Sequence, residues 1–136
     1  MGLFSAIHTS GSGMHVFRTW LDAVSDNISN LSTATSTSDD AFQARYIEAE
    51  AVGYSSDGVG QGARVAAVQL GDPEGRLVSD PNHPLADELG MVRMPDIDLG
   101  DQMTQLITAQ RGYQANLAVI ERARDAYAQA LTIGRS

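Results

Sequence analysis

The sequence contains no cysteine and no lysine, so all nine of its basic residues are arginine. Without cysteine the chain forms no disulfide, and it offers neither a thiol nucleophile nor thiolate ligands for zinc. The basic residues are outnumbered by seventeen acidic ones, which gives a formal charge of −8. No basic stripe is present to neutralise phosphates, and we therefore expect no nucleic-acid partner.

Long apolar runs and clusters of catalytic residues are missing as well. No segment has the length and apolarity of a membrane span, and the first twenty residues lack the basic start of a cleavable signal. His8, His15 and Asp22 share one face of a predicted helix, but steps of about 10 Å separate them too widely to hold one metal ion. We expect no enzyme activity, metal, cofactor or small-molecule substrate.

The acidic residues concentrate in the middle of the chain. Residues 32–97 hold eleven acidic residues and four arginines, whereas residues 98–136 hold four of each. Residues 1–31 carry two acidic residues and one arginine. Near-neutral ends favour close packing against other chains, and an acidic middle is typical of a solvated surface.

The stretch from Leu99 to Leu131 has the strongest pattern in the sequence. Its larger residues recur at alternating steps of four and three, which is typical of a coiled-coil seam. One line of the seam is Leu99, Leu106, Tyr113, Ile120 and Tyr127, and the other is Met103, Gln110, Leu117, Arg124 and Leu131. No proline interrupts the stretch, so it predicts one helix of roughly 50 Å. Gln110 and Arg124 either set the register of a pair or are exposed where no partner covers them.

A matching stripe occupies the start of the chain. One line is Ile7, Met14, Leu21 and Ile28, and a second line is Phe17, Val24 and Leu31, interrupted only by Ser10. Gly11 and Gly13 each weaken a helix by about 1 kcal/mol relative to alanine, so we expect a firm helix from Met14 and a softer beginning. The two stripes predict that helices at 5–31 and 97–132 form an antiparallel, coiled-coil-like pair.

The middle of the chain has shorter and different patterns. Residues 32–41 are rich in serine and threonine and predict a flexible loop. Short alternating segments at 42–52, 63–70 and 76–78, separated by glycines, predict strands of one small sheet. Prolines at 81 and 84 predict an extended loop, and Asp98 is the expected N-cap of the last helix.

The fold class that follows is α+β. Residues 1–31 and 97–136 are expected to form one helical unit. The loop at 32–41 would then lead to a small β-containing insert at 42–96 with its extended loop.

Three motifs carry a resemblance that covers essentially the whole chain. Residues 26–31, Asp-Asn-Ile-Ser-Asn-Leu, resemble the Asn-Ile-Ala-Asn motif of the bacterial flagellar axial proteins. Residues 111–116, Arg-Gly-Tyr-Gln-Ala-Asn, resemble the Ser-Tyr-Gln-Ala-Asn motif near the C-terminus of those proteins. Residues 82–98 are similar to the Asn-Pro-Leu-Ala-Asp block of the proximal-rod members of the family.

The resemblance implies a structural function. Members of the family leave the cell unfolded through the flagellar type III export apparatus, without a cleaved signal. Outside the cytoplasmic membrane their terminal helices bundle into the inner tube of the rod, where they contact copies of themselves and other rod proteins. The middle segment forms an outer domain, and the tube transmits torque without any membrane insertion.

The same comparison implies an assembly interface along both helices. Asn27, Asn30, Gln114 and Asn116 would fix register by bonding to a neighbouring backbone, although the first two also suit a helix C-cap. The expected interface residues are Ile7, Met14, Phe17, Leu21, Val24, Asn27, Ile28, Asn30, Leu31, Leu106, Gln110, Tyr113, Gln114, Asn116, Leu117, Ile120, Arg124, Tyr127 and Leu131. The alternative is a self-contained helical hairpin that binds one partner helix in a groove.

Overall fold

In sequence order, four short strands lie between two long helices. The computed structural model describes residues 2–134, so Met1, Arg135 and Ser136 of the expected helical unit lie outside the described residues. The elements are α1 (Leu3–Ser29), β1 (Arg45–Ala51), β2 (Ala63–Leu70), β3 (Arg76–Ser79), β4 (Met91–Met94) and α2 (Leu99–Ile133). The predicted α+β class is confirmed at this level.

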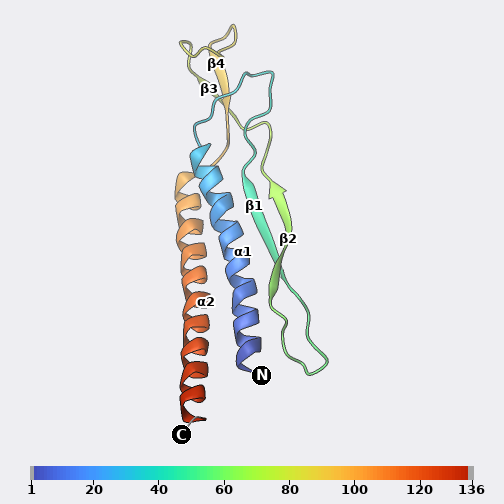
Figure 1. Ribbon diagram of the computed structural model, residues 1–136. Coiled ribbons are helices and arrows are strands. Elements are labelled where there is room, and N and C mark those ends of the chain that lie inside the picture. Colours follow the sequence, from blue (N-terminus) through green and yellow to red (C-terminus); the bar gives the residue numbers. More distant parts are fainter. Residues whose placement is uncertain (1, 135–136) are drawn as a thin grey trace.

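The two helices lie side by side and run in opposite directions (Figure 1). Near the start of α1, the ring of Phe4 meets the ring of Tyr127 edge-on, with centroids 5.7 Å apart. Helix α1 begins at Leu3 and continues through both glycines, well before the firm start expected at Met14. Packing against α2 on one side and a β-hairpin on the other supplies the stability that the glycines remove.

Helix α2 begins at the residue that the sequence indicated. The Asp98 carboxylate accepts a hydrogen bond of 2.8 Å from the backbone N–H of Asp101, which satisfies one of the free donors of the first turn. Asp101 adds a second negative charge at the positive end of the helix dipole.

Strands β1 and β2 form an antiparallel hairpin along the side of α1 opposite to α2, so α1 is the middle layer of three (Figure 1). In the first half of α1, Ser12 contacts the start of β2: its Oγ accepts a hydrogen bond of 3.0 Å from the backbone N–H of Ala63. Val16 and Ala23 are buried in α1, in addition to Val24 of the expected stripe. The sequence predicted a single apolar stripe on α1, and this second buried face was missed because Val16 and Ala23 each lie one residue before the predicted line through Phe17 and Val24.

Strands β3 and β4 form a separate antiparallel ladder, so the expectation of one small sheet was wrong. The pairing of β4 with β3 leaves its other edge free to bond with the serine- and threonine-rich loop. Thr35 and Arg93 exchange two backbone hydrogen bonds of 2.8 and 3.0 Å. The Arg93 guanidinium also donates to the backbone oxygens of Thr37 and Glu74. The loop expected to be flexible is therefore tied to β4 at several points.

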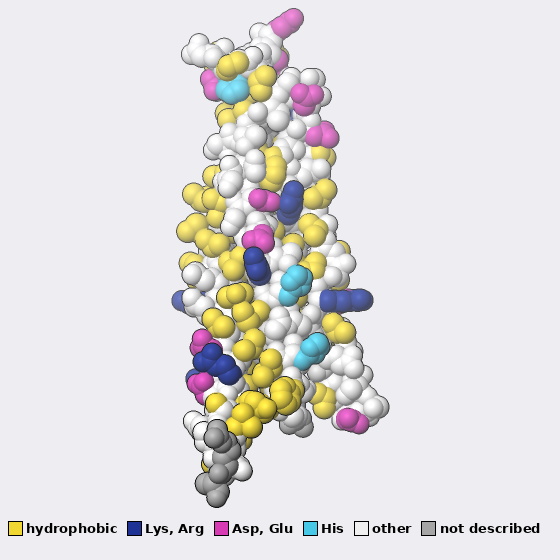
Figure 2. Space-filling model, viewed as in Figure 1, with side chains coloured by type: hydrophobic (Ala, Val, Ile, Leu, Met, Phe, Trp, Pro, Cys, Tyr) yellow, Lys and Arg dark blue, Asp and Glu magenta, His cyan; other side chains and the backbone are white. Residues whose placement is uncertain are grey.

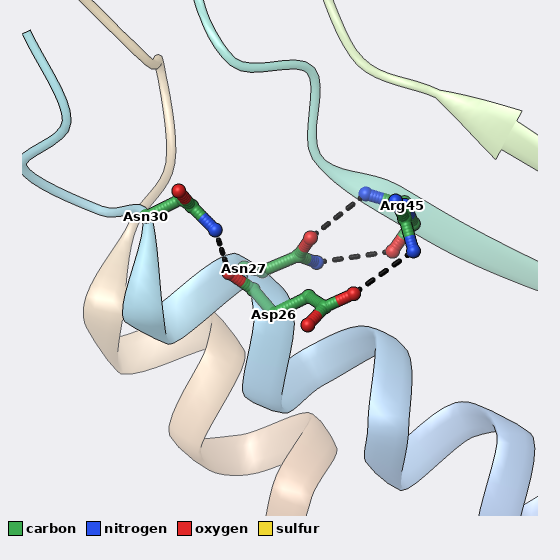
Figure 3. A network of polar contacts seen from close by, with 4 residues as sticks. All are labelled: Asp26, Asn27, Asn30 and Arg45. Carbon is green, nitrogen blue, oxygen red and sulfur yellow. Dashed lines mark hydrogen bonds and ion pairs between the residues drawn. The ribbon is translucent and has the colours of Figure 1, made fainter.

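One buried amide joins the ends of three elements, and Figure 3 shows its contacts with Arg45. Asn27, near the end of α1, is fully buried, and its Oδ1 accepts from the backbone N–H of Arg45 at 2.8 Å. Its Nδ2 donates to the Arg45 backbone oxygen and to Gln102 Oε1, each at 3.0 Å. Asn27 thus fixes the first residue of β1 and the first turns of α2 to the last turn of α1.

Two neighbours of Asn27 complete this junction. Asn30 is the C-cap residue of α1, and its Nδ2 donates to the backbone oxygen of Asp26 at 2.9 Å. The C-cap alternative for Asn30 is therefore confirmed. The Asp26 carboxylate pairs with the Arg45 guanidinium at 2.9 Å, but both side chains are about half exposed, so this ion pair adds little stability.

A tight turn before β4 is organised by Asp87. Its Oδ1 accepts from the backbone N–H groups of Leu89 and Met91, both at 2.9 Å, and its Oδ2 accepts from Thr37 Oγ1 at 3.1 Å. The hydrogen bond from Met91, followed by those from Leu89 and Thr37, holds the pKa of the Asp87 carboxyl below its usual value. The charged form is therefore favoured in the folded protein.

Replacing Asn27 with alanine is expected to destabilise the protein by about 3 kcal/mol. The change removes three hydrogen bonds and leaves both Arg45 backbone groups without their partner. Urea unfolding followed by circular dichroism measures the effect. Ser25→Ala, an exposed change in the same turn region, is the control and should shift the midpoint little. Equal midpoints for the two variants would contradict the role given to Asn27.

Replacing Asp87 with asparagine is expected to reduce the loss of stability in acid. Because the folded pKa is lowered, the carboxylate contributes stability above its unfolded pKa, and that stability is lost as pH falls through the folded value. Urea midpoints at pH 7 and at pH 3 should differ less in Asp87→Asn than in the unchanged protein. The exposed change Asp57→Asn serves as the control. An unchanged difference in Asp87→Asn would exclude this contribution.

Candidate assembly surface

The side of α2 that faces α1 is built mainly from small and polar residues. Gln102, Ala109 and Ala123 are buried there, with 2 %, 0 % and 6 % of their surfaces exposed. Asn116 lies on the same line and is half-buried. Small side chains let the backbones of two helices approach closely, so this line is the contact line with α1.

Of the two lines predicted for the seam of α2, the structure places only the first beside α1. Its first line, which includes Leu106, Tyr113 and Ile120, is half-buried beside the contact line. Its second line lies one residue too far along the helix and points away from α1, because the contact line is Gln102, Ala109, Asn116 and Ala123. The expectation that Leu117 sits inside the helix pair was wrong. The prediction assumed that the larger apolar side chains face α1. The close contact between the helices is instead made by alanines, and their larger neighbours are exposed.

The displaced line forms an exposed surface that we call the outer seam. It consists of Met103, Gln110, Leu117, Arg124 and Leu131, all of them exposed. The exposed fractions of its apolar residues are 43 % for Met103, 37 % for Leu117 and 52 % for Leu131. Leu99, Ile107 and Tyr127 are exposed as well. Helix α2 thus carries two overlapping seams that share the line through Leu106, Tyr113 and Ile120.

Hydrophobic side chains gather on one part of the molecular surface. Figure 2 shows them concentrated over the lower half of the two helices, where both termini lie. Phe4 is 70 % exposed in this region, and Leu131 extends beyond the contact between Phe4 and Tyr127. The last turns of α2 therefore have less cover from their own chain than its first turns have.

The remaining expected interface residues divide into three groups. Val24 and Asn27 are fully buried, and the Asn116 amide donates to the Gly112 backbone oxygen at 2.9 Å. These groups are used within the chain. Gln114 is exposed. The half-buried group is Ile7, Met14, Phe17, Leu21, Ile28, Asn30 and Leu31.

Metal sites, membrane spans and hollows are the remaining candidates in the described part of the chain. Within residues 2–134, no group of three or more histidine, aspartate or glutamate side chains is placed to hold a metal ion. Over the same residues, no helix has the length and apolarity needed to cross a membrane. One open hollow of about 490 Å³ is lined by Asp39, Asp40 and Glu74 around Arg93, and the arginine itself supplies the positive charge there.

This chain is similar to known proteins over nearly its whole length. The family model described as "Flagellar basal body rod FlgEFG protein C-terminal" matches residues 88–133, which include β4 and all of α2. The flagellar basal-body rod protein FlgC of Borreliella burgdorferi is 33 % identical over 98 % of this chain and 98 % of its own length. FlgC of Agrobacterium fabrum is 35 % identical over 96 % and 94 %, and FlgC of Bacillus subtilis is 25 % identical over 99 % and 100 %.

These relatives match from α1 to α2, with identities above 30 % in two of the three. They agree with the resemblance found in the motifs at 26–31, 82–98 and 111–116, and they support the expectation that the chain is not an enzyme. The chain belongs to the FlgC family of flagellar basal-body rod proteins.

Proposed function

We propose that this chain is a structural subunit of the proximal rod, which assembles through its terminal helices into the axial tube that transmits torque. The observation that carries the proposal is the outer seam of α2, an apolar line of helical period exposed in a chain of the rod-protein family. A helix that displays a second seam after packing against its own partner is typical of a helix that packs against two neighbours.

The free energy available from the outer seam supports this function. Complete burial of one leucine or methionine side chain contributes roughly 1.5–3 kcal/mol. Met103, Leu117 and Leu131 are each about half exposed, so covering them in a neighbouring subunit would add on the order of 1 kcal/mol per residue. Contacts of this size are weak in a single pair and become strong when they repeat along a tube.

Polar residues on the outer seam would set the register between subunits. Gln110 and Arg124 lie on the seam and Gln114 lies beside it, all three exposed. The Arg124 guanidinium pairs with the neighbouring Asp125 at 3.5 Å, and both side chains are exposed. Exposed amide and guanidinium groups can bond to a neighbouring backbone or carboxylate, which restricts the positions at which two helices fit together. We therefore assign the contacts between subunits to Gln110, Gln114, Leu117, Arg124, Tyr127 and Leu131. Val24, Asn27 and Asn116 support them from within the chain.

The partners are other rod proteins and further copies of the same chain, with the export apparatus as a partner during secretion. Residues 1–31 and 97–136 would form the tube, and the acidic insert at 42–96 would face outward. The outer seam could instead receive a single helix from one binding partner, which would make the protein a binding module. Motility of a strain that carries a seam variant separates the two functions.

Replacing Leu131 with aspartate is expected to abolish rod formation while leaving the isolated protein folded. Leu131 is 52 % exposed, so the charge is tolerated in the monomer, but it would be buried without a partner in the tube. The variant is expressed in a strain that lacks the protein, and export, rod formation and swimming are measured.

Gln129→Asp provides the matched control, since it adds the same charge to an exposed residue on the opposite flank of the same turn. Swimming should persist with Gln129→Asp and fail with Leu131→Asp. Normal rods in cells that export Leu131→Asp would show that the end of α2 is not an assembly surface. That result would favour the binding module.

A further inference from the structure

Each of the two long helices carries a glycine that receives a side chain from the other helix. A Cβ atom at Gly13 would lie 2.8 Å from Oδ1 of Asn116. A Cβ atom at Gly112 would lie within 3.0 Å of the ring of Phe17, a separation that real Cβ atoms essentially never show. We call these two contacts the glycine seats. They are reciprocal, because α1 supplies one glycine and one inserted side chain, and so does α2.

The inserted side chains have little freedom to move away. The Phe17 ring stacks on Trp20 with centroids 6.1 Å apart and an angle of 18° between the planes. Trp20 in turn donates from Nε1 to Gln105 Oε1 of α2 at 3.2 Å. The Asn116 amide is held by its hydrogen bond to the Gly112 backbone oxygen. A side chain added at either glycine would therefore displace a fixed neighbour.

The seats agree with the Asn27 junction on a single alignment of the helices. Phe17 follows Gly13 by four residues, and Gly112 precedes Asn116 by four. Asn27 lies ten residues after Phe17, and its partner Gln102 lies ten residues before Gly112. In antiparallel helices, equal steps in opposite directions mean that all three contacts belong to one register.

We propose that Gly13 and Gly112 are specificity-determining residues that select the partner and the register of the helix pair. Past its first turn, α2 has no other glycine, so sliding α1 by a turn would bring Phe17 against a residue with a side chain. A foreign N-terminal helix with a side chain in place of Gly13 would clash with Asn116, and one without a ring opposite Gly112 would leave the space above that glycine unfilled. The seats therefore favour an α1 of this sequence, in this one register.

Gly11 offers an internal control for this proposal. It lies in the same helix as Gly13, two residues earlier, but a Cβ atom built there meets no atom within 4 Å. Both glycines have the same low helix propensity, so alanine improves the helix equally at either position. Any difference between the two alanine variants therefore measures the seat and not the helix.

The test compares Gly11→Ala, Gly13→Ala and Gly112→Ala in the purified full-length protein. Gly11→Ala is expected to raise the folded-to-unfolded ratio about fivefold at a fixed urea concentration. Gly13→Ala and Gly112→Ala should lower that ratio at least about tenfold, because a fixed side chain must shift. Gains like that of Gly11→Ala at both seats would overturn the proposal.

Register is measured separately with nitroxide labels on cysteines introduced at the exposed residues His15 and Arg111, since the chain has no cysteine of its own. The unchanged helix pair should give one distance by electron spin resonance, and Gly112→Ala should give a second or broadened distance. A single unchanged distance in Gly112→Ala would overturn the assignment of register to the seats.

The double variant Phe17→Leu with Gly112→Ala keeps the test decisive if Gly112→Ala alone does not fold. The smaller side chain removes the clash, so the double variant should regain folding and the single distance. Failure to regain both would count against the seat. These measurements use the isolated protein, so their outcome is independent of whether the outer seam assembles rods.

Discussion

The Asn27 amide is the contact on which the arrangement of this protein depends. It is fully buried, and it bonds to both backbone groups of Arg45 and to the side chain of Gln102. One side chain therefore determines where the first strand leaves the first helix and where the second helix returns. The hairpin needs this anchor, because a two-stranded ribbon is only marginally stable by itself and most residues of β1 and β2 are exposed.

The sequence predicted the elements better than the contacts between them. Helical periodicity located α1 and α2 to within about two residues, because long amphipathic patterns depend on local geometry. The contact line of α2 was missed by one residue, since Ala109 and Ala123 pack closely where Met103 and Leu117 do not. Strand β4 was not predicted, because four residues are too few to show a period and its pairing depends on β3 and Thr35. The motif at 26–31 was recognised, but no local pattern shows that the Asn27 amide bonds within its own chain.

In the proposed function, the two seams of α2 would relate folding of the chain to assembly of the rod. The line through Leu106, Tyr113 and Ile120 borders both α1 and the outer seam, so its residues belong to both surfaces. Residues on the contact line, such as Ala109, are buried within the fold, whereas Leu131 is exposed on the outer surface. A helix with this division of surfaces can be folded in the monomer and still present a continuous apolar line to a second helix.

The chemistry of the Asn27 junction also determines which conditions it withstands. The three hydrogen bonds of the buried Asn27 side chain involve amides alone, and the Asp26–Arg45 ion pair beside them is half exposed to solvent. Amides do not ionise near neutral pH, and dissolved salt screens them far less than it screens surface charges. A change in acidity or salinity therefore leaves the hydrogen bonds of this joint between helices and hairpin unchanged, as the proposed role in the rod would require.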